Sequence, residues 1–177
     1  MIAYAISDPS TLNFNTLQHD LSHFLNKASM ITYRDKAGMN YEENAKLFLK
    51  YANGFDKVLL HGNYMLAKKL GADGVHLKST QFSDIQKAKH LALFVVVSTH
   101  TIEELKEAEA LGADMATFSP VFDTPNKGLA LGLEILKSAT SQVNIPVLAL
   151  GGILNEDQIR VCEKAGAVGF ASIRYFA

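Results

Sequence analysis

The sequence predicts a single (β/α)8 barrel with a closed, parallel, eight-stranded sheet. Short, continuously apolar runs alternate with amphipathic helical runs along the whole chain, as expected for parallel strands that are covered by helices. There are eight apolar runs, which favours a closed barrel over an open sheet. One turn sequence that begins Gly-Ala recurs at residues 71–73, 112–114 and 166–168, each time between a helical run and an apolar run. Glycine at such a position can end a helix in the left-handed conformation, so the repeat indicates repeated βαβ units.

The expected strands follow the chain in order. They are Ile2–Ser7, Ser29–Arg34, Lys57–His61, Gly74–Leu77, Leu93–Ser98, Met115–Ser119, Val147–Leu150 and Gly169–Ile173. The expected helices between them are Thr16–Lys27, Tyr41–Asn53, Tyr64–Leu70, Ser83–His90, Ile102–Leu111, Leu131–Ser141 and Glu156–Ala165. No helical run follows the last strand, so we expect the eighth helix to be missing or vestigial. Residues 1–177 are then one compact TIM-barrel domain with short loops.

The flank that an eighth helix would cover could be closed in two ways, and the sequence does not decide between them. Tyr175 and Phe176 could belong to a subunit interface, which would make the protein a homodimer. Alternatively, the terminal residues and the neighbouring helices could close the flank within one chain.

Composition excludes several classes of function. The 177 residues are 48% hydrophobic and 20% charged with a net charge of −1, which gives no indication of a nucleic-acid surface. The single cysteine, Cys162, fits a reducing compartment. No apolar stretch approaches the ~20 residues of a membrane helix, and Met1–Ser7 is too short for a signal peptide. We therefore expect a cytoplasmic protein with small-molecule partners.

The adjacent glycines Gly151 and Gly152 end the seventh apolar run and form the most informative local feature. A strand that ends in two glycines before a helix leaves backbone N–H groups unshielded by any Cβ, which suits a phosphate. In (β/α)8 barrels the loops after strands 7 and 8 commonly hold a phosphate. Backbone N–H groups near Ser172 and Ile173, at the end of the eighth strand, could complete such a site.

Cationic residues follow two other strands. Arg34 and Lys36 lie two apart after the second strand, so their side chains could clamp an anion, although a solvated charged turn explains them equally well. After the sixth strand, residues 119–128 form a long loop, and long loops in compact domains are usually functional. Lys127 near its tip could fold over an anion.

Two polar residues stand at the ends of the fourth and fifth strands. His76 lies on an apolar strand, where a lone histidine is more often a satisfied core residue than a ligand. Ser98 ends the fifth strand and is the better site candidate there. The following Thr101 and Glu104 form a capping-box pattern, which explains that segment as a helix start.

Five segments, in this order and spacing, resemble the thiamin-phosphate synthase / TenI family. They are residues 34–36, 71–77, 97–100, 120–127 and 146–153. The resemblance covers nearly the whole chain and implies a (β/α)8 barrel of thiamin biosynthesis. Synthases of this family join an aminopyrimidine pyrophosphate to a thiazole phosphate and release pyrophosphate with Mg²⁺ present. TenI relatives bind the same thiazole phosphate and aromatise it.

The resemblance also implies roles for individual residues. The thiazole-phosphate site corresponds to Gly151, Gly152, Ser172 and Ile173. The pyrophosphate ligands correspond to Arg34, Lys36, Ser98 and Lys127, and the pyrimidine pocket to His76 and Thr124, with which we place Tyr4, Thr32 and His61. Catalytic roles fall to Arg34, Lys36, Lys127 and His76.

The departures from the family pattern concern the metal and the acid–base group. Synthases carry Asn-Asp after the third strand, where this chain has His61-Gly62, and their second metal-binding aspartate falls near Gln81. Magnesium usually needs a carboxylate or two. The family therefore implies Mg²⁺ as a cofactor, yet no residue of this chain is predicted as a metal ligand. TenI tautomerases use a histidine where this chain has Pro120.

Three hypotheses of function follow. The first is a synthase in which Arg34, Lys36 and Lys127 stabilise the charge that develops as pyrophosphate departs. The second is a TenI-like thiazole tautomerase with a histidine as acid–base group. The third is a non-catalytic protein that binds a thiazole or thiamin phosphate. A sugar-phosphate isomerase is disfavoured, because it would need paired carboxylates and the strand ends offer only Asp8, Asp35 and the loop residue Asp123.

Overall fold

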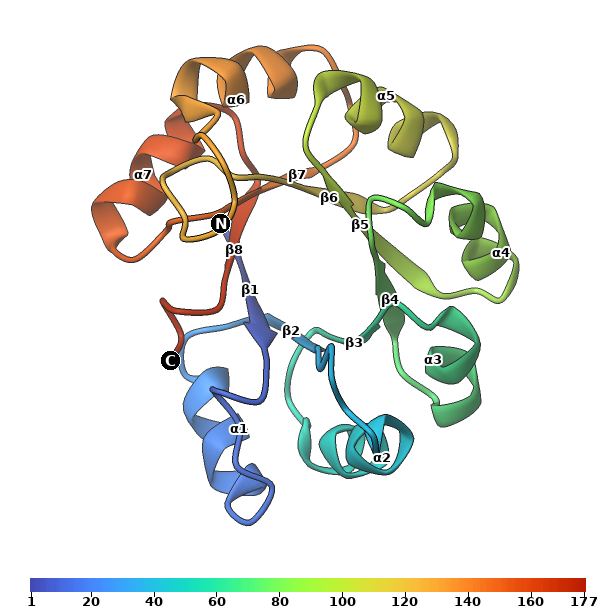
Figure 1. The fold of residues 1–177 in the computed structure, drawn as a ribbon. Coiled ribbons are helices and arrows are strands. Elements are labelled where there is room, and N and C mark those ends of the chain that lie inside the picture. Colours follow the sequence, from blue (N-terminus) through green and yellow to red (C-terminus); the bar gives the residue numbers. More distant parts are fainter.

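The computed structural model describes residues 1–177 and is a closed barrel of eight parallel strands (Figure 1). The strands are β1 (Ile2–Ser7), β2 (Met30–Tyr33), β3 (Lys57–His61), β4 (Gly74–Leu77), β5 (Phe94–Thr99), β6 (Met115–Phe118), β7 (Val147–Leu150) and β8 (Gly169–Ser172). They pair in chain order, and β8 closes the barrel on β1, where Tyr4 lies opposite Met30 on one side and Ala171 on the other. The predicted fold class is confirmed, with strand bounds within one residue of those expected.

Seven α-helices surround the barrel, one after each of the first seven strands (Figure 1). They are α1 (Leu17–Leu25), α2 (Tyr41–Tyr51), α3 (Tyr64–Leu70), α4 (Ile85–His90), α5 (Ile102–Ala110), α6 (Gly132–Ser141) and α7 (Glu156–Lys164). The predicted start of the fourth helix at Ser83 is wrong. Residues Phe82–Asp84 form the 3₁₀ turn η1, because the Asp84 N–H bonds the Gln81 carbonyl three residues back. No helix combines the length and the apolar character that crossing a membrane requires.

The turns that suggested the fold behave as predicted. Gly71, Gly112 and Gly166 have φ angles of 75°, 85° and 92°, which place each of them in the left-handed region just past a helix. The N–H of Ala72 and of Ala113 then returns to a carbonyl in the last turn of the preceding helix. The repeated Gly-Ala sequence therefore marks repeated helix-to-strand turns.

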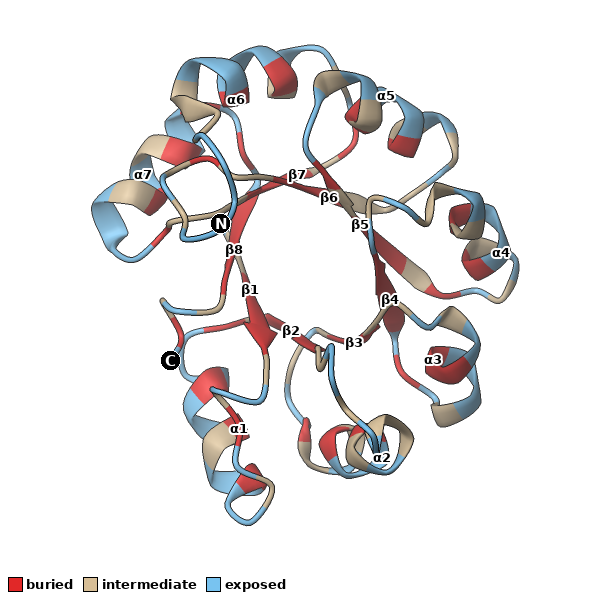
Figure 2. Ribbon diagram, viewed as in Figure 1, coloured by how far each residue is buried: buried red, intermediate tan, exposed pale blue.

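The hydrophobic core consists of two clusters of buried residues. Figure 2 shows that buried residues lie along the strands and on parts of the surrounding helices. The larger cluster contains 40 buried residues. The smaller cluster consists of Tyr4, Ile6, Met30, Leu59, Val96, Leu148 and Ala171. These side chains fill the barrel axis, so the interior is a packed core and ligands can reach only its ends.

The flank without an eighth helix is closed by the residues that follow β8. Phe176 is 1% exposed and stacks on Phe170 with ring centroids 5.6 Å apart, and Tyr175 meets Phe170 edge-on at 5.2 Å. The expectation of a missing eighth helix is confirmed. Because Phe176 is already buried within the chain, it is not free to face a partner in this conformation, and the homodimer stays a prediction.

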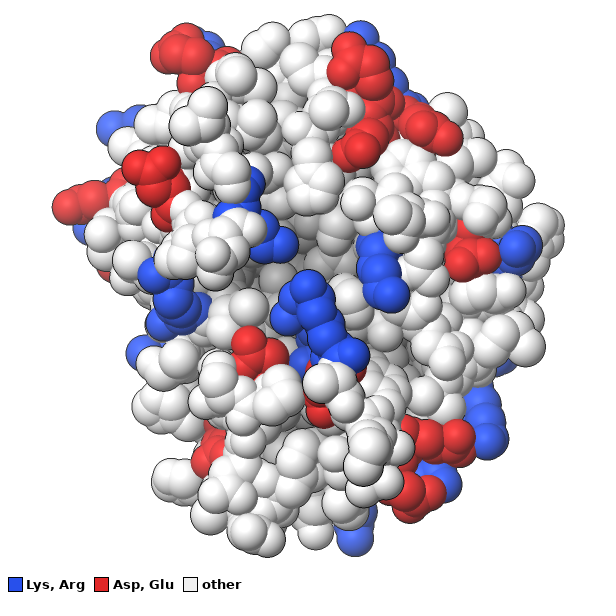
Figure 3. All heavy atoms as spheres, viewed as in Figure 1, with Lys and Arg blue, Asp and Glu red and all other residues white.

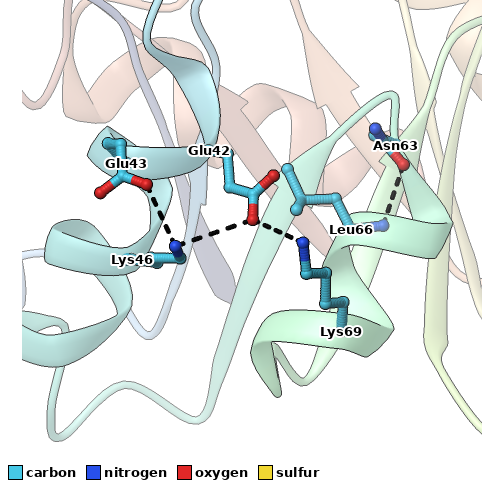
Figure 4. Close-up of polar contacts among 6 residues, drawn as sticks. All are labelled: Glu42, Glu43, Lys46, Asn63, Leu66 and Lys69. Atoms are coloured by element: carbon cyan, nitrogen blue, oxygen red, sulfur yellow. Dashed lines mark hydrogen bonds and ion pairs between the residues drawn. The ribbon is translucent and has the colours of Figure 1, made fainter.

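The outer ring of helices carries most of the ion pairs. Glu42 on α2 contacts Lys46 at 3.7 Å and Lys69 of α3 at 2.7 Å, so one carboxylate links two helices (Figure 4). At the start of α3, the Asn63 side chain accepts a hydrogen bond from the Leu66 N–H at 2.9 Å. Acidic and basic side chains are therefore paired on this part of the surface, which contrasts with the mouth of the barrel.

Candidate active site

A row of three hydrogen-bonded side chains crosses the barrel beneath its C-terminal mouth. The Tyr4 hydroxyl lies 2.9 Å from His76 Nδ1, and His76 Nε2 lies 3.0 Å from Ser98 Oγ. These residues come from β1, β4 and β5, so the row depends on closure of the sheet and not on any local motif. Both imidazole nitrogens of His76 have partners, and its side chain is satisfied although it is buried.

Burial keeps the inner two members of this row neutral. It raises the pKa of Tyr4 far above the ordinary value of a phenol, so Tyr4 keeps its proton and can donate it to His76 Nδ1. Burial also holds the pKa of His76 well below its ordinary value, with smaller contributions from His61 and Arg34. In the neutral tautomer with its proton on Nε2, His76 donates to Ser98.

His61 ends β3 and lies edge-on to His76, with ring centroids 5.5 Å apart. Its backbone is held by Tyr41, whose hydroxyl accepts from the His61 N–H at 3.2 Å and donates to the Tyr33 carbonyl at 3.0 Å. Burial lowers the pKa of His61 to about 4, and the nearby charges of Arg34, Lys78 and Lys36 add to this effect. His61 is therefore neutral at physiological pH.

Four cationic side chains surround this mouth: Arg34 and Lys36 after β2, Lys78 directly after β4, and Lys127 in the loop between β6 and α6. The electrostatics of Lys36 indicate that these charges lie near one another. The charge of Arg34 contributes most to lowering the pKa of Lys36, followed by burial and by the charges of Lys127 and Lys78. None of the four makes an ion pair within 4.0 Å, although six such pairs occur elsewhere. Figure 3 shows Lys and Arg side chains around the centre of this face.

Lys78 was not among the residues singled out from the sequence. The available signal was its position: it immediately follows Leu77, the last residue of β4, as Arg34 follows the last residue of β2. Residues at strand ends meet at one mouth in a (β/α)8 barrel.

Only glycine fits at positions 151 and 152, for a steric reason that the sequence did not reveal. Gly151 and Gly152 have φ angles of 102° and 69°. A Cβ at Gly151 would lie 2.7 Å from Pro120 Cα, and one at Gly152 would lie 2.6 Å from the Asp123 carbonyl oxygen. The loop between β6 and α6 therefore packs directly on the glycine pair, and its hydrogen bonds from Val121 and Phe122 to the Leu150 and Gly151 carbonyls hold it there.

The N–H groups beneath that loop nevertheless have no partners. The backbone N–H groups of Gly151, Gly152 and Ile153 after β7, and of Ile173 and Arg174 after β8, donate to no protein acceptor. Unpaired N–H groups cost free energy unless water or a ligand satisfies them. Five donors at two adjacent strand ends are suited to an anion, as the sequence predicted for the glycine pair.

Three hydroxyl-bearing residues among the predicted ligands are placed as follows. The Ser172 hydroxyl donates to the Ile153 carbonyl at 3.0 Å and accepts from the Tyr175 N–H, so it ties β8 to the β7–α7 loop. Thr124 Oγ1 donates to the Phe122 carbonyl at 2.9 Å within its own loop. Thr32 Oγ1 on β2 is buried without any partner.

The residues at the implied metal site do not fit magnesium. No group of three or more His, Cys, Asp or Glu side chains lies close enough together to hold a metal ion. Gly62 and Gln81 stand at the two positions where the family has carboxylates, and they bond each other: Gln81 Nε2 donates to the Gly62 carbonyl at 2.8 Å. Gln81 Oε1 accepts from the Lys78 N–H at 3.0 Å. The Gln81 amide and a glycine without a side chain therefore stand where the family has the carboxylates that Mg²⁺ prefers.

Two of the remaining carboxylates near the mouth stabilise their own turns. Asp8 Oδ1 accepts from the Ser10 N–H at 2.9 Å, and Asp35 Oδ1 accepts from the Ala37 N–H at 3.0 Å. Both are short-range contacts within a loop. They stabilise turns and do not converge on a common point.

Fold and site together define a (β/α)8 barrel with a cationic mouth and free backbone donors at the ends of β7 and β8. Comparison with known proteins then places it more closely. The family model described as thiamine monophosphate synthase matches residues 3–176, so the chain belongs to that family. The resemblance inferred from the sequence is confirmed, and with it a protein of thiamin biosynthesis of the synthase type.

Individual relatives agree with this assignment. The chain is 37% identical to an Aquifex aeolicus protein that carries the name of a candidate second thiamine-phosphate synthase, over 98% of this chain and 96% of that protein. It is 32% identical to the thiamine-phosphate synthase of Syntrophomonas wolfei, over 96% of this chain and 85% of the relative. The solved structure of thiamine phosphate pyrophosphorylase from Pyrococcus furiosus superposes with a TM-score of 0.81 at 30% identity, covering 97% of this chain and 85% of that one.

Proposed function

We propose that this protein is a transferase that joins an aminopyrimidine pyrophosphate to a thiazole phosphate and releases pyrophosphate. The observation that carries the proposal is the presence of two separate sets of anion donors at one mouth. Unpaired cations stand over β2, β4 and the β6–α6 loop, whereas free backbone N–H groups stand at the ends of β7 and β8. A reaction between two phosphorylated substrates needs two such sets.

In this proposal the two sets have different tasks. The N–H groups of Gly151, Gly152 and Ile173 hold the thiazole phosphate, because a rigid backbone site fixes position without adding mobile charge. Arg34, Lys36 and Lys127 hold the pyrophosphate. When the carbon–oxygen bond to pyrophosphate breaks, the electron pair leaves with it, and the cations stabilise that charge. The new bond to the thiazole phosphate forms at the carbon that pyrophosphate leaves.

The buried row beneath the mouth supplies the floor of the pyrimidine pocket. Tyr4, His76 and Ser98 fix one another through two hydrogen bonds, and Thr32 Oγ1 is a buried polar atom without a protein partner. A neutral, pre-oriented polar floor suits an aminopyrimidine ring, which has both donors and acceptors at its edge. His61 and Thr124 border the same pocket in this proposal.

One observation favours a second candidate, a thiazole tautomerase: His76 sits in a defined hydrogen-bonded row and could move a proton. Its pKa, however, is held well below neutrality by burial, and that of His61 is about 4. General acid–base groups work best with a pKa near the operating pH. The position of the TenI histidine is Pro120, which packs against Gly151. These residues support the transferase better than the tautomerase.

The test is to mix both phosphorylated precursors with the protein and measure pyrophosphate release, with and without Mg²⁺. We expect release that depends on both precursors and that falls in Lys127→Ala. Thiazole-phosphate binding without any release would refute the transferase. Faster conversion of the non-aromatic thiazole tautomer, abolished in His76→Asn or His61→Asn, would identify the tautomerase. Binding with neither turnover would indicate a non-catalytic binding protein.

A further inference from the structure

We propose that this protein binds pyrophosphate without a divalent cation, with the Lys78 ammonium group supplying the positive charge at the implied metal position. The inference rests on the proposed function, since it concerns the same pyrophosphate group. It starts from the disagreement between the metal site that the family implies and the residues that stand there.

A protein side chain bridges the implied metal position. Gln81 bridges the ends of β3 and β4, because its amide donates to the Gly62 carbonyl and accepts from the Lys78 N–H. It also donates to Asp84 Oδ2 at 3.3 Å. Both ends of the amide are therefore engaged, and Gln81 supplies a neutral oxygen in place of a carboxylate.

Lys78 lies over Gly62. A Cβ at Gly62 would be 3.4 Å from Lys78 Cε and 3.8 Å from Gln81 Oε1. An aspartate at position 62 would therefore meet the end of the Lys78 side chain. Gly62 also has a φ of 79°, a conformation that disfavours aspartate and other residues with a Cβ. The position of the absent carboxylate thus adjoins a lysine side chain.

The charge balance at this mouth also favours an anion. Lys78 is exposed and makes no ion pair within 4.0 Å, and its charge, after those of Arg34 and Lys127, contributes to lowering the pKa of Lys36. The nearby carboxylates do not pair with these cations, because Asp84 is paired with Lys87 at 3.1 Å and Asp35 accepts from the Ala37 N–H of its own turn. Four unpaired cations at one mouth repel one another, and a polyanion removes that repulsion. A metal ion would add to it.

The experiment measures binding of inorganic pyrophosphate by isothermal titration calorimetry, once in EDTA and once with Mg²⁺. We expect binding in EDTA that Mg²⁺ does not strengthen. Lys78→Ala should raise the dissociation constant in EDTA by about 10-fold, the effect of losing one charge-assisted hydrogen bond. Lys78→Arg should restore most of the affinity. The matched control is Lys137→Ala, which removes an exposed lysine of α6 and should change nothing.

Each outcome bears on the inference separately from the transferase. Binding that requires Mg²⁺, no binding under either condition, or an unchanged affinity in Lys78→Ala would overturn the inference. Metal-free pyrophosphate binding in a protein that never releases pyrophosphate from the two precursors would support the inference and refute the transferase. Pyrophosphate release from the two precursors that occurs only with Mg²⁺ would support the transferase and refute metal-free binding.

Discussion

Replacing His61 by glutamine should reduce the acid sensitivity of this protein. In the folded chain the pKa of His61 is lowered to about 4, chiefly by burial and further by Arg34, Lys78 and Lys36. In the unfolded chain a histidine titrates near 6.5. Between these two values the unfolded chain binds a proton that the folded chain does not, so the free energy of unfolding falls as the pH falls from 6.5 toward 4.

The size of this effect follows from the two pKa values. At pH 5 the unfolded histidine is almost fully protonated, whereas the folded one is almost fully neutral. The difference corresponds to about 1.6 kcal/mol of lost stability between pH 6.5 and pH 5. For a chain of this length that is a shift of roughly 3–6 °C in Tm. His76 acts in the same direction, because its pKa is also lowered by burial.

The assay is urea unfolding followed by circular dichroism at a series of pH values, for wild type and His61→Gln. The wild type should lose about 1.6 kcal/mol more than the variant between pH 6.5 and pH 5. His19→Gln, which replaces an exposed histidine of α1, is the control and should follow the wild type. If the two curves of wild type and His61→Gln run parallel within about 0.5 kcal/mol over this interval, the reasoning on buried histidines is wrong.

Three further predictions concern packing. Gly152→Ala and Gly71→Ala both place a Cβ at a positive φ, which costs about 1 kcal/mol. Only the Cβ at Gly152 meets the loop between β6 and α6, so urea unfolding should show a further loss of about 1–3 kcal/mol for that variant, and calorimetry should show a weaker affinity for thiazole phosphate. Equal losses in the two variants would contradict the contact with the loop. Tyr4→Phe leaves Nδ1 of the buried His76 without a partner and should cost about 1–3 kcal/mol in the same assay, whereas a neutral result would argue against the bond. Phe176→Ala should cost about 3–5 kcal/mol, and a loss below about 1 kcal/mol would mean that something else closes the flank; elution as a strict monomer at micromolar concentration would count against a homodimer.

The fold could be predicted because its signals are local and repeated. Each helix-to-strand turn of the Gly-Ala type carries its own glycine, and each strand is a continuous apolar run, so the sequence contains the same unit several times. The missing eighth helix could also be predicted, because no helical run follows the last apolar run. The 3₁₀ turn before α4 was not, because it depends on one backbone hydrogen bond, Asp84 to Gln81, that no residue pattern announces.

The candidate site was predictable only in part, because much of it is made across the barrel. Arg34, Lys36 and Lys127 stand at strand ends or in a long loop, which are positions that a sequence can mark. The bond between Tyr4 and His76 joins residues 72 apart in the chain. It exists because β1 and β4 face each other across the barrel axis, and only the closed sheet brings them together.

The loop between β6 and α6 physically connects the two sets of anion donors. It carries Lys127 toward the cations of the mouth, and its backbone at Asp123 packs against Gly152 beside the free N–H groups. The two phosphate positions proposed above therefore border the same loop, one at its backbone and the other at Lys127. The glycine pair is thus required twice: as a source of N–H donors and as the surface on which this loop rests.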